Sequence, residues 1–165
     1  MKHPRVIRNF NLFVDGQGFA GRVEEAELPS LTLNTDEFRG GGMDAPVDVE
    51  LGMEKMEFTA TFADWDPDLL GLLGTSNQPV TLRAAAQAQG GPVEPIRIQL
   101  RGLWRGLEPG GVKAGDRATL KVSATLAYYR FTQAGTDVIE IDLENMIRRI
   151  RGVDQLADQR AALGL

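Results

Sequence analysis

The sequence contains no cysteine and only one histidine, His3, close to its start. The lack of cysteine excludes disulfides, thiolate metal sites and cysteine nucleophiles, and a lone histidine excludes most histidine-based catalysis and metal binding. Ordinary hydrolase triads are therefore excluded. Long apolar runs are also missing: no stretch approaches the roughly 20 residues that cross a bilayer, and the N-terminus shows no apolar run of signal-peptide type. We expect a soluble protein without a membrane anchor.

The length of the chain, 165 residues, favours one domain with one core, spanning residues 1–165. The net charge of −5 is unevenly distributed along it. Residues 24–57 carry ten acids against Arg39 and Lys55, whereas the rest of the chain carries sixteen basic residues against thirteen acids. A basic stretch consists of Arg97, Arg101, Arg105, Lys113 and Arg117. Unlike stretches of this kind suit head-to-tail contact between copies, although an ordinary mixed surface is the alternative.

Six segments have the pattern of β-strands, most with one buried and one wet face. They span residues 6–14, 54–63, 80–87, 96–107, 118–131 and 138–141. Turn residues separate several of them, beginning with Asp15-Gly16, which tolerates the positive φ of a hairpin turn. In segment 118–131 the side chains expected to point inward are Leu120, Val122, Ala124, Leu126 and Tyr128. The pattern predicts a mainly antiparallel β domain.

Three regions are expected to depart from this pattern. Residues 35–46, with Gly40-Gly41-Gly42 at their centre, are predicted to form a long irregular loop, within an extended arm over residues 35–53. Asp66 and Pro67 are expected to start a short helix that ends at Gly74. Asp142 is expected to cap a helix that carries Leu143, Met146, Ile147 and Ile150 on one face. Asp154 is expected to cap a final short helix, so that residues 142–165 form a helical tail.

Candidate chemistry in the sequence is sparse. Gly16, Gly18 and Gly21 match the dinucleotide fingerprint, but the motif requires a helix within a parallel βαβ unit, and the pattern here favours a hairpin turn. Asp64, Asp66 and Asp68 imitate the start of a calcium loop without its glycine or its twelfth-position acid, and serve better as helix-start charges. We therefore predict no enzyme, no cofactor and no metal site; a nucleotide-dependent enzyme is a distant alternative.

Several segments together resemble the major tail tube proteins of contractile-tailed bacteriophages. They are Arg8 to Gly16, Leu28 to Leu31, Glu37 to Met43 followed by Ala45 to Asp48, and the C-terminal run from Tyr129 through Asn145-Met146-Ile147 to Leu165. The resemblance extends over essentially the whole chain. It implies a β-sandwich or barrel-like subunit that closes into hexameric rings, which stack into the inner tube of a contractile tail.

The resemblance also implies a task, a place and partners. The tube would conduct genomic DNA, without binding it specifically, after contraction of the sheath. Its partners would be further copies of itself, the tail sheath protein, and baseplate and tail-terminator proteins. The protein would be a virion component, assembled in the cytoplasm of the host bacterium. The alternative is the same tube in a headless contractile particle of the bacteriocin, secretion or injection type.

Two sets of residues are candidates for these roles. The segment that reaches a neighbouring subunit or ring is predicted to include Phe38, Arg39, Gly40, Gly41, Gly42, Met43, Asp44, Asp48 and Glu50. DNA that slides through a lumen must not be held, and basic side chains would hold it through phosphate contacts. The predicted lumen-facing residues are therefore polar or acidic, namely Glu57, Thr59, Thr61, Ser123 and Thr125, although Lys55 and Lys121 lie on the same strand faces.

Overall fold

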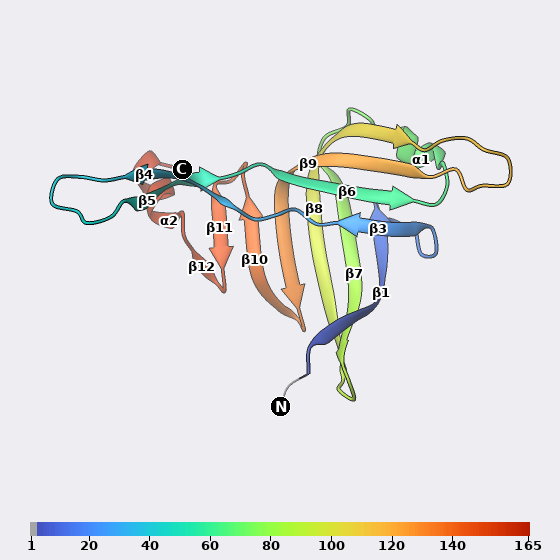
Figure 1. The fold of residues 1–165 in the computed structure, drawn as a ribbon, viewed down its shortest axis with the longest axis horizontal. Helices are drawn as coiled ribbons and strands as arrows, with labels where there is room; N and C mark the ends of the chain where they lie inside the picture. Colours follow the sequence, from blue (N-terminus) through green and yellow to red (C-terminus); the bar gives the residue numbers. More distant parts are fainter. Residues whose placement is uncertain (1–2) are drawn as a thin grey trace.

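The computed structural model describes residues 3–165 as an open, two-layered antiparallel β structure (Figure 1). The large sheet has the strand order β12-β11-β10-β9-β8-β7-β1-β2. Its strands are β1 (Arg5–Val14), β2 (Gln17–Gly18), β7 (Gln78–Ala88), β8 (Val93–Pro109), β9 (Leu120–Gln133), β10 (Thr136–Asp142), β11 (Ile147–Ile150) and β12 (Val153–Asp154). The predicted antiparallel β class is confirmed.

The second layer crosses the large sheet and shares two strands with it. Strands β3 (Val23–Glu27) and β6 (Met56–Phe62) run across β7 in Figure 1. β6 pairs with the first half of β9, which in turn pairs with the last part of β8. The second layer is thus four strands wide, in the order β3-β6-β9-β8.

A glycine allows β8 to pass from one layer to the other. The register between β8 and β9 shifts at Arg101/Gly102 and again at Trp104/Gly106. A Cβ atom built on Gly102 would lie 2.1 Å from the backbone oxygen of Thr125. Because no side chain fits there, Gly102 lets the two strands approach closely at the bend.

The core lies between the two layers. Its largest fully buried side chains come from both, including Trp104, Phe19, Phe58, Phe62, Leu12, Met56 and Leu120. In β6 the predicted inward residues Met56, Phe58, Ala60 and Phe62 are all buried. Burial of an aromatic or leucine side chain contributes about 1.5–3 kcal/mol each, so this interface supplies most of the fold's stability.

The prediction that Tyr128 points into the core is wrong, because β9 contains a bulge. Arg101 pairs with Tyr128 but Gly102 pairs with Leu126, so Ala127 has no counterpart on β8. The extra residue reverses the alternation of side chains beyond it. Tyr129 is therefore buried in place of Tyr128, whose hydroxyl instead donates a hydrogen bond to Glu140 on the opposite face.

The region around residues 35–46 is more regular than predicted. β4 (Leu33–Phe38) and β5 (Val47–Met53) form a separate two-stranded antiparallel sheet, and only residues 39–46 connect them as a loop. We call this hairpin, residues 33–53, the arm; it extends away from the body of the molecule (Figure 1). The glycines interrupt the strands only at the tip, since the β-rich segments on either side can pair with each other.

The helix expected at Asp142 is not formed. Residues 143–146 make a turn, and β11 then pairs with β10. Asp142 does accept hydrogen bonds from the backbone N–H groups of Glu144 and Asn145, but Met146 adopts φ 52° and reverses the chain. The spacing of Ile147 and Ile150 is compatible with either structure, and pairing with β10 decides between them.

Both helices of the structure are short. α1 (Pro67–Leu70) begins as predicted, with Asp66 as its N-cap accepting from the N–H of Asp68, but its cap residue is Gly71 rather than Gly74. α2 (Ala157–Leu163) is the only helical part of the tail, and its N-cap is Leu156 rather than Asp154. No helix within residues 3–165 is both long and apolar enough to cross a membrane.

Candidate functional surfaces

The sequence features that imitate ligand sites have structural roles. Asp15 and Gly16 have φ values of 48° and 80° and turn β1 into β2, so the glycine motif opens a hairpin and not a helix. Asp64 and Asp66 both bind Arg22, at 2.9 and 2.6 Å. Burial raises the pKa of Asp66, but the hydrogen bond from Arg22 and the N–H of Asp68 outweigh it and lower that pKa overall. In the described residues no three or more acidic or histidine side chains gather as metal ligands would.

A polar face covers the outside of the second layer. On β6 and β9, Glu57 pairs with Thr125, Thr59 with Ser123, and Thr61 with Lys121. The five residues predicted to share a face therefore do lie together, as neighbours across two strands. β3 extends this surface, because Glu27 pairs with Thr59 and accepts a 3.0 Å hydrogen bond from its hydroxyl. The sequence analysis did not assign Glu25 and Glu27 to this face, although the alternation in β3 would have revealed them.

The charges on the polar face are partly balanced. Glu57 forms ion pairs with Lys55 at 3.1 Å and with Arg105 at 2.9 Å. The hydrogen bond from Lys55, followed by the charge of Arg105, lowers the pKa of Glu57. Two basic side chains of the face, Lys55 and Arg105, therefore contact a carboxylate, whereas Lys121 forms no ion pair within residues 3–165.

The two outer strands of the second layer have unpaired edges. Among the strands of residues 3–165, β3 pairs only with β6. On β8, the backbone of Trp104 is hydrogen-bonded to Gly74 and Thr75, and residues 105–109 pair only with β9. An unpaired strand edge presents free backbone donors and acceptors to another chain. The same four-stranded layer thus offers one edge on each side.

The arm has one apolar and one acidic face. Strand alternation places Phe38, Val47, Val49 and Leu51 on one face, where Phe38 and Leu51 are 58% and 61% exposed. Glu37, Asp48 and Glu50 lie on the other face. At the tip, the backbone N–H of Gly40 donates to the Met43 sulfur at 3.1 Å, Arg39 donates to the Met43 carbonyl, and Asp44 lies in the loop. The arm presents a row of large apolar side chains to solvent.

An ion pair attaches the arm to the C-terminal part of the chain. Glu50 binds Arg148 of β11 at 2.6 Å, and the Arg148 side chain is only 8% exposed. The Nε of Arg148 also donates to Gln155. Sequence reasoning singled out Glu50 but not Arg148, which lies in the segment that was expected to be helical.

The basic stretch noted in the sequence does not form one patch. Arg117 pairs with Glu24 at 2.8 Å and Arg105 with Glu57, so both meet the acidic stretch of the same chain. Arg97 and Arg101 lie elsewhere, on strand positions that pair with β7 and β9. Some of the opposite charges of the acidic and basic stretches are therefore paired with each other within one subunit.

The surfaces above belong to a β protein with exposed strand edges, a polar side-chain face and an apolar arm. A family model described as phage tail tube protein FII matches residues 4–164. The chain therefore belongs to the phage tail tube protein FII family.

Full-length relatives support this assignment. The chain is 30% identical to the tail tube protein of Escherichia phage P2, over the whole of both chains. It is 28% identical to the major tail tube protein of Serratia phage KSP20, over all of this chain and 99% of the other. It is thus a structural tail tube protein of the contractile-phage type, a component of the virion and not an enzyme.

Solved structures share the fold at low sequence identity. One is the PVC sheath–tube complex of an extracellular contractile injection system in its extended state, with a TM-score of 0.60 and 10% identity over 77% of this chain and 90% of the other. Another is the sheath/tube terminator of that system, with a TM-score of 0.61 and 10% identity over 80% of this chain and 99% of the other.

Proposed function

We propose that copies of this protein close into hexameric rings that stack into the inner tube of a contractile tail, through which DNA leaves after sheath contraction. The observation that carries the ring is the pair of free edges, β3 and the end of β8, at opposite sides of one four-stranded layer. Edge-to-edge pairing between copies would join these layers into a continuous barrel. Ring closure would also remove the exposed edges, which otherwise invite aggregation.

The polar face of the second layer is the proposed lining of the lumen. Glu57, Thr59, Thr61, Ser123 and Thr125 lie on it together with Glu25 and Glu27. Lys55 and Arg105 are engaged by Glu57 and so offer less free charge to a phosphate. Since each phosphate contact adds affinity through counterion release, a lining of hydroxyls and carboxylates lets DNA pass.

The arm is the proposed contact to a neighbouring subunit or ring. Phe38, Val47, Val49 and Leu51 form an exposed apolar face on a two-stranded sheet, which is marginally stable alone in water. The tip residues Arg39 to Asp44 and the acidic residues Asp48 and Glu50 flank this face. A contact that joins different surfaces on two copies can repeat without closing, as a stacked tube requires.

The proposed partners are the tail sheath protein, the baseplate and a tail terminator, with assembly in the host cytoplasm. The solved neighbours are a sheath–tube complex, a sheath/tube terminator and a baseplate of contractile particles. Those neighbours also favour a second candidate, the tube of a headless injection particle. Genes for a capsid and a portal protein beside the gene for this protein would indicate a phage. The absence of such genes would indicate a headless particle.

Negative-stain electron microscopy of the purified protein tests the tube. We expect rings or hollow tubes, formed alone or after addition of baseplate components that nucleate them. A protein that stays monomeric with both sheath and baseplate partners present would contradict the proposal.

The lumen assignment has its own test. Tubes of the variant T59K/S123K should retain short duplex DNA at low salt, while wild-type tubes should not. A matched variant, K113Q, lies on an exposed loop and should behave as wild type. Equal DNA retention by all three proteins would show that the polar face does not line the lumen.

A further inference from the structure

Two arginines face each other on the outside of the large sheet. Arg83 of β7 is directly opposite Arg97 of β8, and both side chains are exposed. Their neighbours in sequence, Leu82 and Ile98, are buried, so the arginines point away from the core. Like charges directly opposite each other on adjacent strands destabilise a sheet.

No carboxylate of the subunit is in direct contact with this pair. Within residues 3–165, neither Arg83 nor Arg97 forms an ion pair. Asp137, on the same face of the sheet, is already bound by Arg130 and by the hydroxyl of Thr132. Asp137 attracts Arg97 at longer range, as its lowered pKa reflects, but neither arginine has a carboxylate in direct contact in the free subunit.

The arginines line a trough of about 690 Å³ on this face. Asn9, Asn11, Pro95 and Thr132 are among its other lining residues. The guanidinium of Arg83 lies over the ring of Phe13, 5.6 Å from its centroid, which holds its orientation. Asn11 contributes a side-chain oxygen that is shielded from solvent and has no hydrogen-bond donor in the described residues; as an acceptor it suits a backbone N–H of a bound peptide and not its carboxylate. The trough is a concave, partly apolar site that holds two forked donors.

We propose that this arginine trough, formed around Asn11, Arg83, Arg97 and Thr132, binds a carboxylate-bearing segment of the tail sheath protein. The proposal rests on the proposed function, because it needs the polar face of the second layer to line the lumen. Because Leu82 and Ile98 are buried, the alternating Arg83 and Arg97 lie on the side of the large sheet that faces away from the core and from that layer. In a tube it would then lie on the exterior, where a sheath surrounds the subunits.

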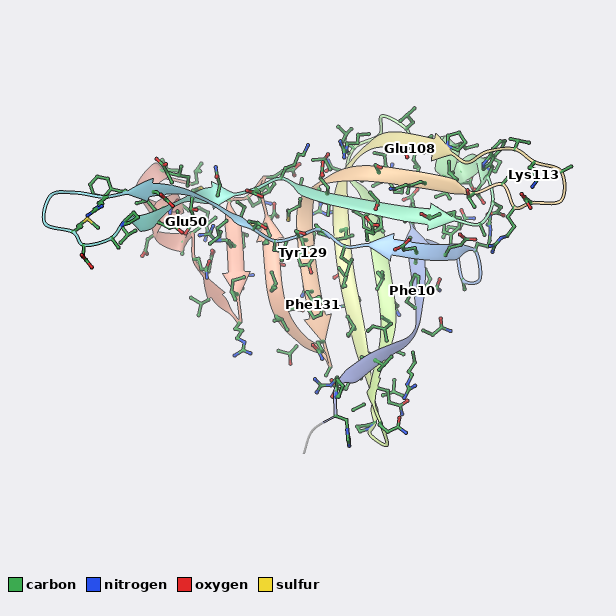
Figure 2. The ribbon with its side chains drawn as sticks, viewed as in Figure 1. Phe10, Glu50, Glu108, Lys113, Tyr129 and Phe131 are labelled. Carbon is green, nitrogen blue, oxygen red and sulfur yellow. The ribbon has the colours of Figure 1, made fainter. Side chains whose placement is uncertain are left out.

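The chemistry of the trough favours an acidic peptide segment. A carboxylate between two guanidinium groups accepts forked hydrogen bonds and removes the repulsion between them. The acidic arm of another copy is a poorer candidate, since it continues β3 and β6 in the layer nearer the lumen (Figure 2). DNA in the lumen would be on the opposite side of the subunit.

Co-sedimentation of assembled tubes with purified sheath protein tests the proposal. The variant R83Q/R97Q should bind sheath at least tenfold more weakly than wild type, and R83K/R97K should be intermediate because lysine keeps the charge but not the fork. The control K113Q/K121Q removes the same charge from other surfaces and should bind as wild type. Raising the salt concentration should weaken wild-type binding more than that of R83Q/R97Q.

A second variant separates a binding role from a structural one. In R83E a carboxylate faces Arg97 across the two strands, so the melting temperature of the free subunit should be unchanged or raised while sheath binding is lost. A lowered melting temperature would show that Arg83 stabilises the subunit, which contradicts the proposal.

Three further outcomes would each contradict the proposal that the trough binds the sheath protein. If R83Q/R97Q tubes form and bind sheath normally, the trough is not the sheath site, although the tube itself stands. If R83Q/R97Q stays folded but forms no tubes, the trough joins copies of this chain, and the sheath assignment is wrong. If tubes of the wild-type protein retain a duplex DNA oligonucleotide and R83Q/R97Q tubes do not, the trough binds phosphate and the proposal fails.

Discussion

Glu50 of the arm and Arg148 of β11 form an ion pair of 2.6 Å across 98 positions of the chain, with the arginine almost wholly buried. This contact joins the arm to the strand that follows the turn after Asp142. Because the buried guanidinium needs its carboxylate, the pair favours one placement of the arm over others. The arm is thus oriented before it meets a partner (Figure 2).

Removal of the Glu50 charge should loosen the arm. We expect E50Q to lower the free energy of unfolding by about 1–2 kcal/mol, since it leaves Arg148 buried beside a neutral amide. Hydrogen exchange should show faster opening of β4 and β5 than in wild type. The control D116N removes an exposed carboxylate 3.9 Å from Lys113 and should change neither quantity. Unchanged exchange in E50Q would mean that the arm is held by other contacts.

The bend in β8 should be intolerant of any side chain at Gly102. We expect G102A to lower the free energy of unfolding by about 3 kcal/mol, because its methyl group would meet the Thr125 backbone oxygen. Urea denaturation measures the loss. G111A is the matched control, since no atom lies within 4 Å of a Cβ at that position. Equal stability of the two variants would show that the strands can separate at little cost.

The Asp66–Arg22 contact should make stability depend on pH in the acid range. The folded state lowers the pKa of Asp66 below its ordinary value of 3.8, so the carboxylate stabilises the fold fully above that pH. As the pH falls below 3.8 and through the folded-state pKa, this contribution is lost. Asn is an equally good N-cap, so D66N keeps the cap but removes the charge.

The measurement is denaturant unfolding at pH 7 and pH 3. Wild type should lose more stability between these pH values than D66N does. The same loss in both proteins would assign the acid sensitivity to other carboxylates.

The apolar face of the arm should be needed for assembly and not for folding. We expect F38S/V49S to remain a folded monomer and to form no tubes, because both side chains are exposed in the subunit. Deletion of residues 40–45 should have the same effect. Circular dichroism and electron microscopy measure the two properties. The control E37S alters only the opposite face of β4 and should still form tubes. Tubes from F38S/V49S would show that the arm is not the connector.

The candidate surfaces could be predicted only where they depend on local sequence. Alternation in β6 and β9 was enough to place Glu57, Thr59 and Thr61 on one face with Ser123 and Thr125. It was not enough to find Arg105 beside Glu57, since that contact comes from a third strand. Arg83 and Arg97 are separated by a turn and face each other only because of the register of β7 and β8.

The sequence by itself determined the β class, the inward residues of β6, the turn at Asp15-Gly16 and the resemblance to tail tube proteins, because strand alternation and turn chemistry are local properties. Tertiary structure decided the rest. Residues 147–150 became a strand through pairing with β10, Ala127 reversed the alternation in β9, and the arm became a hairpin. In each case hydrogen bonds to a distant strand outweighed a local preference worth less than about 1 kcal/mol per residue.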